Sequence, residues 1–348
     1  MQPIDDAQQW DSALKALPEP HVLQTWAWGA FKGRSGWSTE RFLWGAVDHP
    51  MAAAQILTQQ RGRSRLGYIP KGPTLDWGDP AQVEAVLSDL EGLARRSAML
   101  TLKLDPDVRA DTPEGKAVVA LLKRRGWRPS FEQIQFRNTM TLDLRADLDT
   151  LMDRMKSKWR YNIRLAVRKG VTVRTAGLSE LSLLYRMYAE TAERDAFIIR
   201  EEPYYRDVWK TFMEAGLATP LIAEAESDPV AMMVLFHFGA RAWYMYGAST
   251  ELHREYMPNY LLQWEAVRKV QALGCTTYDL WGAPDTLDEA DPLWGVYRFK
   301  AGFGAEFVPH IGAYDYAPHA LLYRLYAFLR PRWVALAQRL YWAKRPRH

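Results

Sequence analysis

The sequence predicts a mixed α/β fold made of two similar units, and three observations lead to this class. The chain has 348 residues, which is long for one domain and enough for two that each bury a core. Hydrophobic residues make up 48% and charged residues 25%, as in ordinary globular proteins. Finally, the series of strands and helices predicted for the first half recurs in the second half. We therefore expect two domains of similar size.

The first copy of this series begins with short apolar runs that end in turn residues, a pattern typical of strands. A stretch with apolar residues at helical spacing follows, and then another strand and a short helix. In chain order, the predicted elements are a strand at 51–57, a strand within 65–73, a helix at 81–99, a strand at 101–107 and a helix that ends at 121–127.

The second copy repeats this order. Its helix is supported by apolar residues on one face, among them Leu261 and Val267, and by Gly274, which suits the residue after a helix. The predicted elements are a strand at 229–238, a strand at 241–249, a helix at 259–274, a strand at 276–282 and a final segment at 297–304.

The two copies have nearly the same spacing between corresponding residues. Gly72 and Asp105 are 33 positions apart in the first copy, and Gly247 and Asp279 are 32 positions apart in the second. The order of strands and helices resembles a GCN5-related N-acetyltransferase fold that occurs twice in tandem. We expect a first acetyltransferase-like domain, a second one that begins with a basic helix, and a basic amphipathic C-terminal tail, at residues 1–145, 146–316 and 317–348.

The usual acyl-donor site of that fold is missing from both copies. An acetyltransferase binds the pyrophosphate of coenzyme A at a glycine-rich turn before a helix. The corresponding segments are 73–82, with one glycine, and 251–260, which contains Pro258 and no glycine. A Walker A loop, a G-x-G-x-x-G motif, a G-x-S-x-G motif and a metal-ligand spacing among the seven His are also absent. The sequence therefore predicts an acyl donor other than coenzyme A and no metal site.

Charge and cysteine content indicate the compartment and the kind of partner. The net charge is +4 and the pI is near 9.0, which favours basic surfaces that face an anionic partner. The single Cys275 suits a reducing compartment and is expected to be a small buried residue. The first residues lack the features of a signal peptide, and no apolar run is long enough to predict a membrane span. We therefore expect a cytoplasmic protein.

A strongly basic, helix-compatible segment lies between the two copies, at residues 145–174. Closely spaced cations are typical of surfaces that bind a nucleic-acid backbone, whereas the alternative is a solvated helix face that pairs with carboxylates elsewhere. Trp159, Tyr161 and Ile163 are expected to pack against the protein rather than to stack on bases. The candidate RNA-binding residues are Arg154, Lys156, Lys158, Arg160, Arg164, Arg168 and Lys169.

Part of this segment, KSKWRYNIRLAVRKGV at 156–171, resembles the signature of the Fem family of peptidyltransferases, which form the interpeptide bridges of peptidoglycan. Larger family members carry a long helical arm in the second domain, and no insert of that length lies between 175 and 300 here, so the chain resembles the compact form. The resemblance covers nearly the whole chain and includes QTWAWGAFK (24–32), YIPKGP (68–73), KLDPD (103–107), YGAS (246–249) and FKAGFG (299–304).

The resemblance implies a tRNA-dependent aminoacyltransferase. It would move an amino acid from aminoacyl-tRNA, its co-substrate, to the side-chain amine of the third stem-peptide residue of a peptidoglycan precursor, either lipid II or UDP-MurNAc-pentapeptide. No further cofactor is implied, the basic segment becomes the tRNA site, and we expect a monomer. Two alternatives remain open: a CoA-dependent N-acyltransferase, and a non-catalytic protein that binds RNA or a membrane surface.

The resemblance also implies where the precursor binds. Arg and Lys side chains suit phosphate or carboxylate, and a Tyr hydroxyl adds a polar contact. Tyr205 and Tyr244 are close neighbours that could replace the two tyrosines chosen. The implied substrate-binding residues are Lys32, Arg200, Tyr204 and Tyr246.

The implied catalytic pair is Phe299 and Lys300. A fixed cation beside the reacting carbonyl would stabilise the oxyanion that forms when an amine attacks an aminoacyl ester. Asp105 is a third candidate, because it could accept the proton that the attacking ammonium releases, although an Asp before a Pro also forms turns.

The tail at 317–348 interleaves Leu, Tyr and Trp with seven Lys and Arg. We expect Pro331 to split it into two short helices. Basic amphipathic segments bind anionic bilayers, which suits peripheral contact with the cytoplasmic face of the inner membrane. The alternative is a helix that packs on the second domain.

Overall fold

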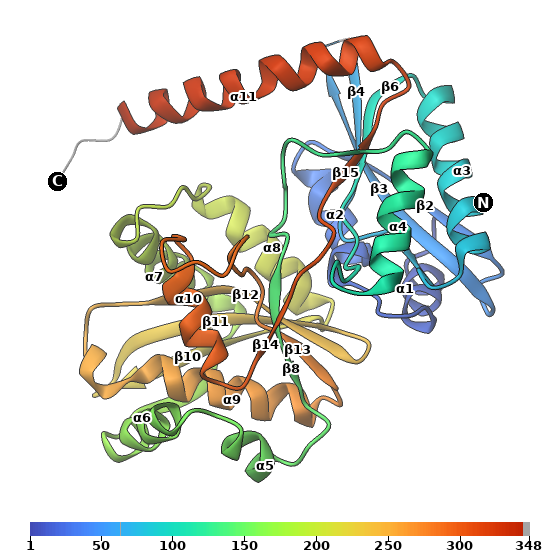
Figure 1. Ribbon diagram of the computed structural model, residues 1–348. Helices are drawn as coiled ribbons and strands as arrows, with labels where there is room; N and C mark the ends of the chain where they lie inside the picture. Colours follow the sequence, from blue (N-terminus) through green and yellow to red (C-terminus); the bar gives the residue numbers. More distant parts are fainter. Residues whose placement is uncertain (63, 344–348) are drawn as a thin grey trace.

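The computed structural model describes residues 1–62 and 64–343, and these form two mixed β-sheets covered by helices (Figure 1). The first sheet has the order β1-β2-β3-β4-β6-β15-β7, with β5 paired to β3. Only β4 and β6 are parallel among its described strand pairs. Its strands are β1 (Gln2–Pro3), β2 (Ser38–Gly45), β3 (Pro50–Arg61), β4 (Ser64–Ile69), β5 (Thr74–Leu75), β6 (Met99–Leu104), β7 (Arg128–Pro129) and β15 (Tyr314–Tyr316).

Two pairs of helices cover this first sheet, one pair on each face. Side-chain oxygens of Asp6, Asp79 and Thr112 accept backbone N–H groups at three helix starts, as the capping residues of stable helices do. The helices are α1 (Ala7–Ala16), α2 (Trp26–Arg34), α3 (Pro80–Arg96) and α4 (Pro113–Arg124).

The second sheet has the order β14-β8-β13-β12-β11-β10-β9, in which β12 and β13 are the parallel pair. Its strands are β8 (Thr139–Asp143), β9 (Thr172–Thr175), β10 (Ala218–Ala225), β11 (Asp228–Phe238), β12 (Arg241–Ser249), β13 (Thr277–Asp279) and β14 (Glu306–Val308). The helices of this unit are α5 (Leu148–Asp153), α6 (Ser157–Arg168), α7 (Leu181–Arg194), α8 (Glu202–Glu214), α9 (Pro258–Ala272) and α10 (Trp294–Ala301).

The two sheets match strand for strand. When the strand order of the second sheet is taken from β9, strands β9 to β13 correspond to β1 to β4 and β6 of the first sheet. In each sheet the two parallel strands are joined by a crossover helix, α3 in the first unit and α9 in the second. The strand beside that pair is exchanged: β15 follows the second unit in the chain but pairs with β6, and β8 precedes it but pairs with β13. The predicted tandem fold is confirmed, and these two strands cross the predicted division at residue 145.

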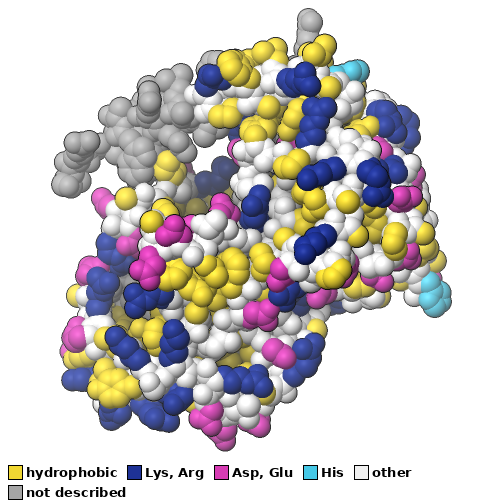
Figure 2. Space-filling model, in the orientation of Figure 1, with side chains coloured by type: hydrophobic (Ala, Val, Ile, Leu, Met, Phe, Trp, Pro, Cys, Tyr) yellow, Lys and Arg dark blue, Asp and Glu magenta, His cyan; other side chains and the backbone are white. Residues whose placement is uncertain are grey.

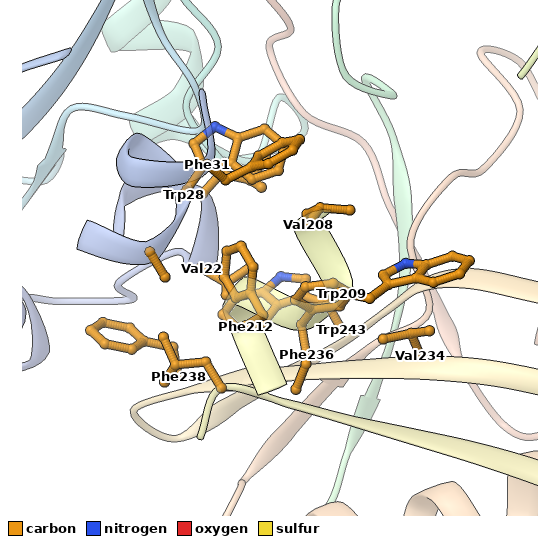
Figure 3. Close-up of a cluster of buried hydrophobic side chains, with 14 of the residues drawn as sticks. Val22, Trp28, Phe31, Val208, Trp209, Phe212, Val234, Phe236, Phe238 and Trp243 are labelled. Atoms are coloured by element: carbon orange, nitrogen blue, oxygen red, sulfur yellow. The ribbon is translucent and has the colours of Figure 1, made fainter. Parts of the chain in front are cut away.

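Three hydrophobic cores hold the molecule together, and one of them belongs to both units. The helices α3 and α4 pack on the outer face of the first sheet, and α6 and α9 pack on the outer face of the second. The third cluster, the shared core, joins α1 and α2 to α8 and β11 (Figure 3). A buried Phe contributes about 1.5–3 kcal/mol. The residues labelled in Figure 3 are Val22, Trp28, Phe31, Val208, Trp209, Phe212, Val234, Phe236, Phe238 and Trp243.

The basic segment at 145–174, which is helix-compatible in sequence, does not form one continuous helix. It forms α5, then α6, and then β9. The backbone N–H of Lys156 donates to the carbonyl of Gly302 at 2.9 Å, and this tertiary contact takes the chain out of the helix between α5 and α6. Tyr161 is 55% exposed, so the expectation that it packs like Trp159 and Ile163 is wrong.

The C-terminal tail forms one helix, α11 (Ala320–Ala343), that continues through Pro331, so the expected split into two helices is wrong. The Arg332 guanidinium donates to the carbonyl of Phe328 at 2.6 Å, one turn back along the helix. In its described side chains the helix packs on the first sheet, where the Tyr323 hydroxyl donates to Asp315 at 2.8 Å. Residues 344–348, and with them Lys344, Arg345 and Arg347, lie outside the described residues.

Among the residues that the structure describes, we find no helix with both the length and the hydrophobicity of a membrane span.

Candidate active site

The second sheet opens at the end of its parallel strand pair. Three residue pairs join β12 to β13, the last of them Trp243 with Asp279, although β12 runs on to Ser249. Beyond Asp279 the chain follows β8 instead, because the N–H of Leu280 donates to the carbonyl of Met140 at 2.8 Å. Within residues 1–62 and 64–343, one edge of β12 therefore has no neighbouring strand over its last residues.

A β-bulge in β12 decides which tyrosines face which core. Val234 pairs with Tyr246 and Leu235 with Tyr244, so Met245 is an extra residue in the strand. The bulge interrupts the alternation of faces, and Tyr244 packs in the core under α9 whereas Tyr246 packs against the shared core. Of the two interchangeable tyrosines in this strand, Tyr246 is thus the one on the side of Tyr204 and Arg200.

Lys300 lies on α10 beside this opening and is 5% exposed. Its Nζ donates hydrogen bonds to the carbonyls of Trp281 at 2.8 Å and Gly282 at 2.6 Å. Trp281 has a φ of 62°, a left-handed conformation that large side chains rarely adopt. The turn after β13 is therefore held in an unfavourable conformation that directs two carbonyls at one amine.

The environment of Lys300 alters its protonation. Burial lowers the pKa of Lys300 to about 7, and the nearby charge of Asp279 opposes this shift only in part. The amine therefore changes its charge near neutral pH, which is the range in which a group can act in proton transfer or charge stabilisation.

Phe299 points to a different side of α10 from Lys300. It lines a cavity of about 440 Å³ between the end of β12 and the start of α9, together with Tyr260, whose ring centroid is 5.3 Å away. Trp159 of α6 donates its indole N–H to the carbonyl of Phe299 at 2.9 Å. A side chain at Gly302 would overlap Trp159, so this glycine permits α6 to approach α10 closely.

The four predicted substrate-binding residues lie together where α2, α8 and β12 meet, and we call them the cation–tyrosine cluster. The Nζ of Lys32 donates to the hydroxyl of Tyr204 at 3.1 Å, and the guanidinium of Arg200 lies 4.6 Å from the centre of the Tyr204 ring. Tyr246 is close enough to Arg200 and Tyr204 for their charges to affect its pKa. The cluster consists of Lys32, Arg200, Tyr204 and Tyr246.

Two cations of this cluster, Lys32 and Arg200, have no counter-ion among the described residues. Burial, and then repulsion by Arg200, lower the pKa of Lys32 to about 8. Across residues 1–62 and 64–343, neither Lys32 nor Arg200 forms an ion pair with a carboxylate. An anionic ligand would supply the missing charge.

A cavity of about 370 Å³ opens beside Arg200 and extends toward α11. Tyr326 and Arg330 of α11 line it from one side, and the first sheet lines it from the other. Four cations line this cavity, namely Arg61, Lys103, Arg200 and Arg330. Lys103 pairs with Asp315 and Arg330 pairs with Glu132. The other two cations have no described carboxylate partner, which suits an anionic ligand.

Asp105 is buried at the end of β6 and joins that strand to the segment after β4. Its two carboxylate oxygens accept hydrogen bonds from the backbone N–H of Lys71 at 2.6 Å and from the Tyr68 hydroxyl at 2.8 Å. Burial raises the pKa of Asp105 to about 6, against the opposing charge of Lys71. The contacts of Asp105 are those of a residue that closes the first sheet, and it makes no described contact with Lys300.

A network of buried charges joins the two units, and the sequence had not marked its members as functional. Asp107 Oδ1 lies 3.0 Å from the Lys71 Nζ, and Oδ2 lies 3.5 Å from Arg241. Burial alone would raise the pKa of Asp107, but the charges of Lys71 and its other neighbours outweigh this and keep it well below its usual value. Lys71 and Asp107 belong to the YIPKGP and KLDPD stretches, so the motifs carried a signal for them.

The seven candidate RNA-binding cations lie on or beside α6, at the lower left of Figure 2, where Lys and Arg side chains gather. Six of them are exposed, and Arg160 is half-buried because its guanidinium donates to the carbonyls of Asp153 and Met155. In the part of the chain that the structure describes, none of the seven pairs with a carboxylate. The carboxylate partners that the alternative expects are therefore not found among the described residues, whereas the exposure of these side chains agrees with a solvated helix face.

Comparison with known proteins adds a family and a fold. The model of the FemAB family matches residues 7–228 and 214–330. A lipid II:glycine glycyltransferase of Staphylococcus epidermidis is 24% identical over 93% of this chain and 94% of its own length. One from Staphylococcus aureus is 23% identical with the same coverage.

Two solved structures share the architecture. FemX superposes with a TM-score of 0.85 at 22% identity and covers 94% of this chain and all of its own. A tandem GNAT protein from the clavulanic acid biosynthesis pathway has a TM-score of 0.54 at 16% identity, over 90% of this chain and 97% of its own. These likenesses confirm the predicted pair of acetyltransferase-like units.

Proposed function

Because the chain belongs to the FemAB family, we propose that it transfers an amino acid from aminoacyl-tRNA to the side-chain amine of the third stem-peptide residue of a peptidoglycan precursor. The observation that carries this proposal is the opening between β12 and β13, with Lys300 at its side and the cation–tyrosine cluster on the same strand.

The donor side is supported by α6. Its exposed cations form no described ion pair, and an RNA backbone would neutralise them with release of counter-ions. The same helix contacts Phe299 through Trp159, and Phe299 lines the cavity at the end of β12. A tRNA bound on α6 would thus have a route for its aminoacyl end to the opening.

The start of α9 supports a donor other than coenzyme A. Pro258 is at its first position and has no N–H, and the N–H of Tyr260 donates to the carbonyl of Met257 at 3.1 Å. Few free N–H groups therefore remain there for a pyrophosphate.

The acceptor side is supported by the cation–tyrosine cluster and the cavity beside it. Lys32 and Arg200 suit the phosphate or carboxylate groups of a precursor. The names of the curated relatives make lipid II the first acceptor and glycine the first amino acid to test. UDP-MurNAc-pentapeptide is the soluble alternative.

The chemistry requires no ATP, because the aminoacyl ester is already activated. The acceptor amine attacks the ester carbonyl, a C–N bond forms, and the tetrahedral intermediate carries a negative oxygen. The C–O bond to the tRNA then breaks, the 3′-terminal ribose hydroxyl leaves with a proton, and the amine loses one. In its charged form Lys300 would stabilise the oxyanion, a role worth about 10²–10³ in rate.

The central experiment incubates the protein with a pool of charged tRNAs and each acceptor in turn, and reads the products by mass. We expect a gain of one amino-acid residue on an acceptor. A parallel reaction with acetyl-CoA tests the competing N-acyltransferase, which would add an acetyl group instead. Folded protein that adds nothing to any acceptor would contradict the proposal.

The tRNA site has its own test. In an Arg164→Gln/Arg168→Gln variant, we expect weaker tRNA binding, with a salt dependence reduced by about one unit of slope per lost phosphate contact. Lys123→Gln/Arg124→Gln on α4 removes the same charge from an exposed site on the first unit and serves as the control. Equal losses in both variants would argue against a specific site on α6.

A further inference from the structure

Over residues 320–332, where its side chains are described, α11 has one side packed on the first unit and the opposite side exposed. Tyr323 is 5% exposed, and the rings of Tyr323 and Tyr326 pack on Phe131 with centroids 6.3 and 5.7 Å apart. On the opposite side, Leu321, Leu325 and Phe328 are 56% to 79% exposed. Leu322 and Leu329 lie along one flank between the two sides and are 55% and 39% exposed.

The charge of the tail indicates what covers this apolar side. Residues 317–348 contain seven Lys and Arg and no Asp or Glu. In the described part, Arg324 and Arg332 flank the apolar side chains, and the Arg332 guanidinium lies 3.5 Å from the centre of the Phe328 ring. An Arg in this position can keep its charge in water while its stem covers apolar surface. Figure 2 shows hydrophobic and basic side chains intermixed at the top of the molecule, where Figure 1 places the start of α11.

The combination of exposed apolar side chains and positive charge on α11 favours one kind of partner over another. A second copy of α11 would bring the same positive charge to the interface, and like charges oppose such a pairing. An anionic bilayer offers hydrocarbon for the exposed Leu and Phe side chains and negative head groups for the Arg side chains. We propose that α11 lies in the surface of an anionic lipid bilayer, with Leu321, Leu325 and Phe328 at the boundary between head groups and acyl chains.

The packed side of the same helix borders the acceptor cavity. Tyr326 and Arg330 line that cavity together with Arg200, and Arg330 pairs with Glu132 at 3.4 Å. With α11 on the bilayer, the cavity opens next to the membrane surface, where a lipid-linked precursor presents its head group. This inference rests on the proposed function and selects the lipid-linked acceptor over the soluble one.

The first test measures sedimentation of the full chain with vesicles of phosphatidylglycerol and phosphatidylcholine, against vesicles of phosphatidylcholine alone. We expect binding to the anionic vesicles, and a loss of at least about tenfold in a Leu325→Glu/Phe328→Glu variant. Leu252→Glu/Leu273→Glu is the matched control, because both residues are exposed on the second unit. Absence of wild-type binding, or equal binding by both variants, would overturn the proposal.

Circular dichroism and thermal unfolding of each variant verify that the fold is retained, which we expect because the substituted side chains are exposed. Sedimentation velocity without lipid provides a further outcome. A dimer that Leu325→Glu/Phe328→Glu dissociates would assign this face to a second copy and overturn the bilayer proposal.

Transfer assays separate this inference from the proposed function. With lipid II in detergent, the Leu325→Glu/Phe328→Glu variant should match the wild type, and with lipid II in anionic vesicles it should be slower. Vesicle binding without transfer to any acceptor would refute the proposed function and leave the membrane contact standing. Transfer without vesicle binding, or equal rates of variant and wild type in vesicles, would refute the membrane contact alone.

Discussion

The two units share one order of strands and helices, but their parallel strand pairs end differently. In the first unit, five residue pairs join β4 to β6 as far as Ile69 and Leu104, and Asp105 then bonds to the backbone of Lys71. In the second, pairing stops at Asp279, whose carboxylate bonds to the Thr139 hydroxyl and to the N–H of Trp281.

This difference explains why two units of the same fold contain one candidate active site. The two aspartates hold equivalent positions in the repeat, yet Asp105 ties its strand to the neighbour, whereas Asp279 ties its strand to β8 and to its own turn. The first unit is thereby closed and contributes Asp107 and Lys71 to the buried charges between the units, and the second unit is open and carries Lys300. Each of four predictions tests one side of this contrast, in decreasing order of expected free energy.

The largest effect should come from the closed unit. Asp107→Ala leaves Lys71 and Arg241 buried without their shared partner, and we expect the free energy of unfolding to fall by about 3–5 kcal/mol. Urea unfolding measures this change. Asp111→Ala, at an exposed residue on the same loop, is the control and should have a small effect. Equal changes in the two variants would mean that the network does not stabilise the interface.

A substitution at Lys300 in the open unit should lower the transfer rate more than it lowers the stability of the fold. Lys300→Met removes an amine that donates to two carbonyls, and we expect the transfer rate to fall about 10²–10³-fold, or about 2.7–4 kcal/mol. Single-turnover kinetics measure the loss. Arg298→Met, at an exposed residue of the same helix, should leave the rate near that of the wild type. Unchanged turnover in Lys300→Met would exclude the proposed role.

Asp105 tests whether the closed unit takes part in the chemistry. Asp105→Ala leaves the N–H of Lys71 and the Tyr68 hydroxyl without their acceptor, which should cost about 1–3 kcal/mol of stability. We expect the rate per folded molecule to change less than in Lys300→Met. A rate loss as large as that of Lys300→Met would make Asp105 catalytic and break the contrast.

The smallest effect is a dependence on pH. Because burial lowers the pKa of Lys300 to about 7, the charged amine is lost as pH rises through that value. The acceptor amine also loses its proton as pH rises, but it does so equally with wild type and with Lys300→Met, so the ratio of the two single-turnover rates isolates Lys300. If the charge of Lys300 stabilises the oxyanion, this ratio of wild type to variant should fall above pH 7, toward a limit of about tenfold per unit. A pH profile of both rates checks this, and a ratio that rises through pH 7 would show that the neutral amine of Lys300 acts as a base instead.

Local patterns in the sequence were enough to predict the strands and helices of the repeat. The strands near 51–57 and 229–238 and the helices near 81–99 and 259–274 are confirmed, because period and turn residues act over a few positions. The break before α6 was missed, since a contact with the distant Gly302 decides it. The continuity of α11 through Pro331 was missed as well.

The candidate site also has a part that the sequence predicted and a part that depends on contacts between distant residues. The resemblance supplied Lys32, Arg200, Tyr204 and Tyr246, and their approach to one another depends on the shared core, which packs α2 against α8. Residues of the buried network, such as Arg241, meet Asp107 only across the interface between the units. No local pattern encodes a contact between residues so far apart in the chain.

The sequence by itself determined two tandem α/β units, a basic segment between them and turns poor in glycine, because these features depend on side-chain type and short-range order. Only the tertiary structure decided which unit is open. That choice depends on the direction of the hydrogen bonds that Asp105 and Asp279 make with distant neighbours, and on the exchange of β8 and β15 between the sheets.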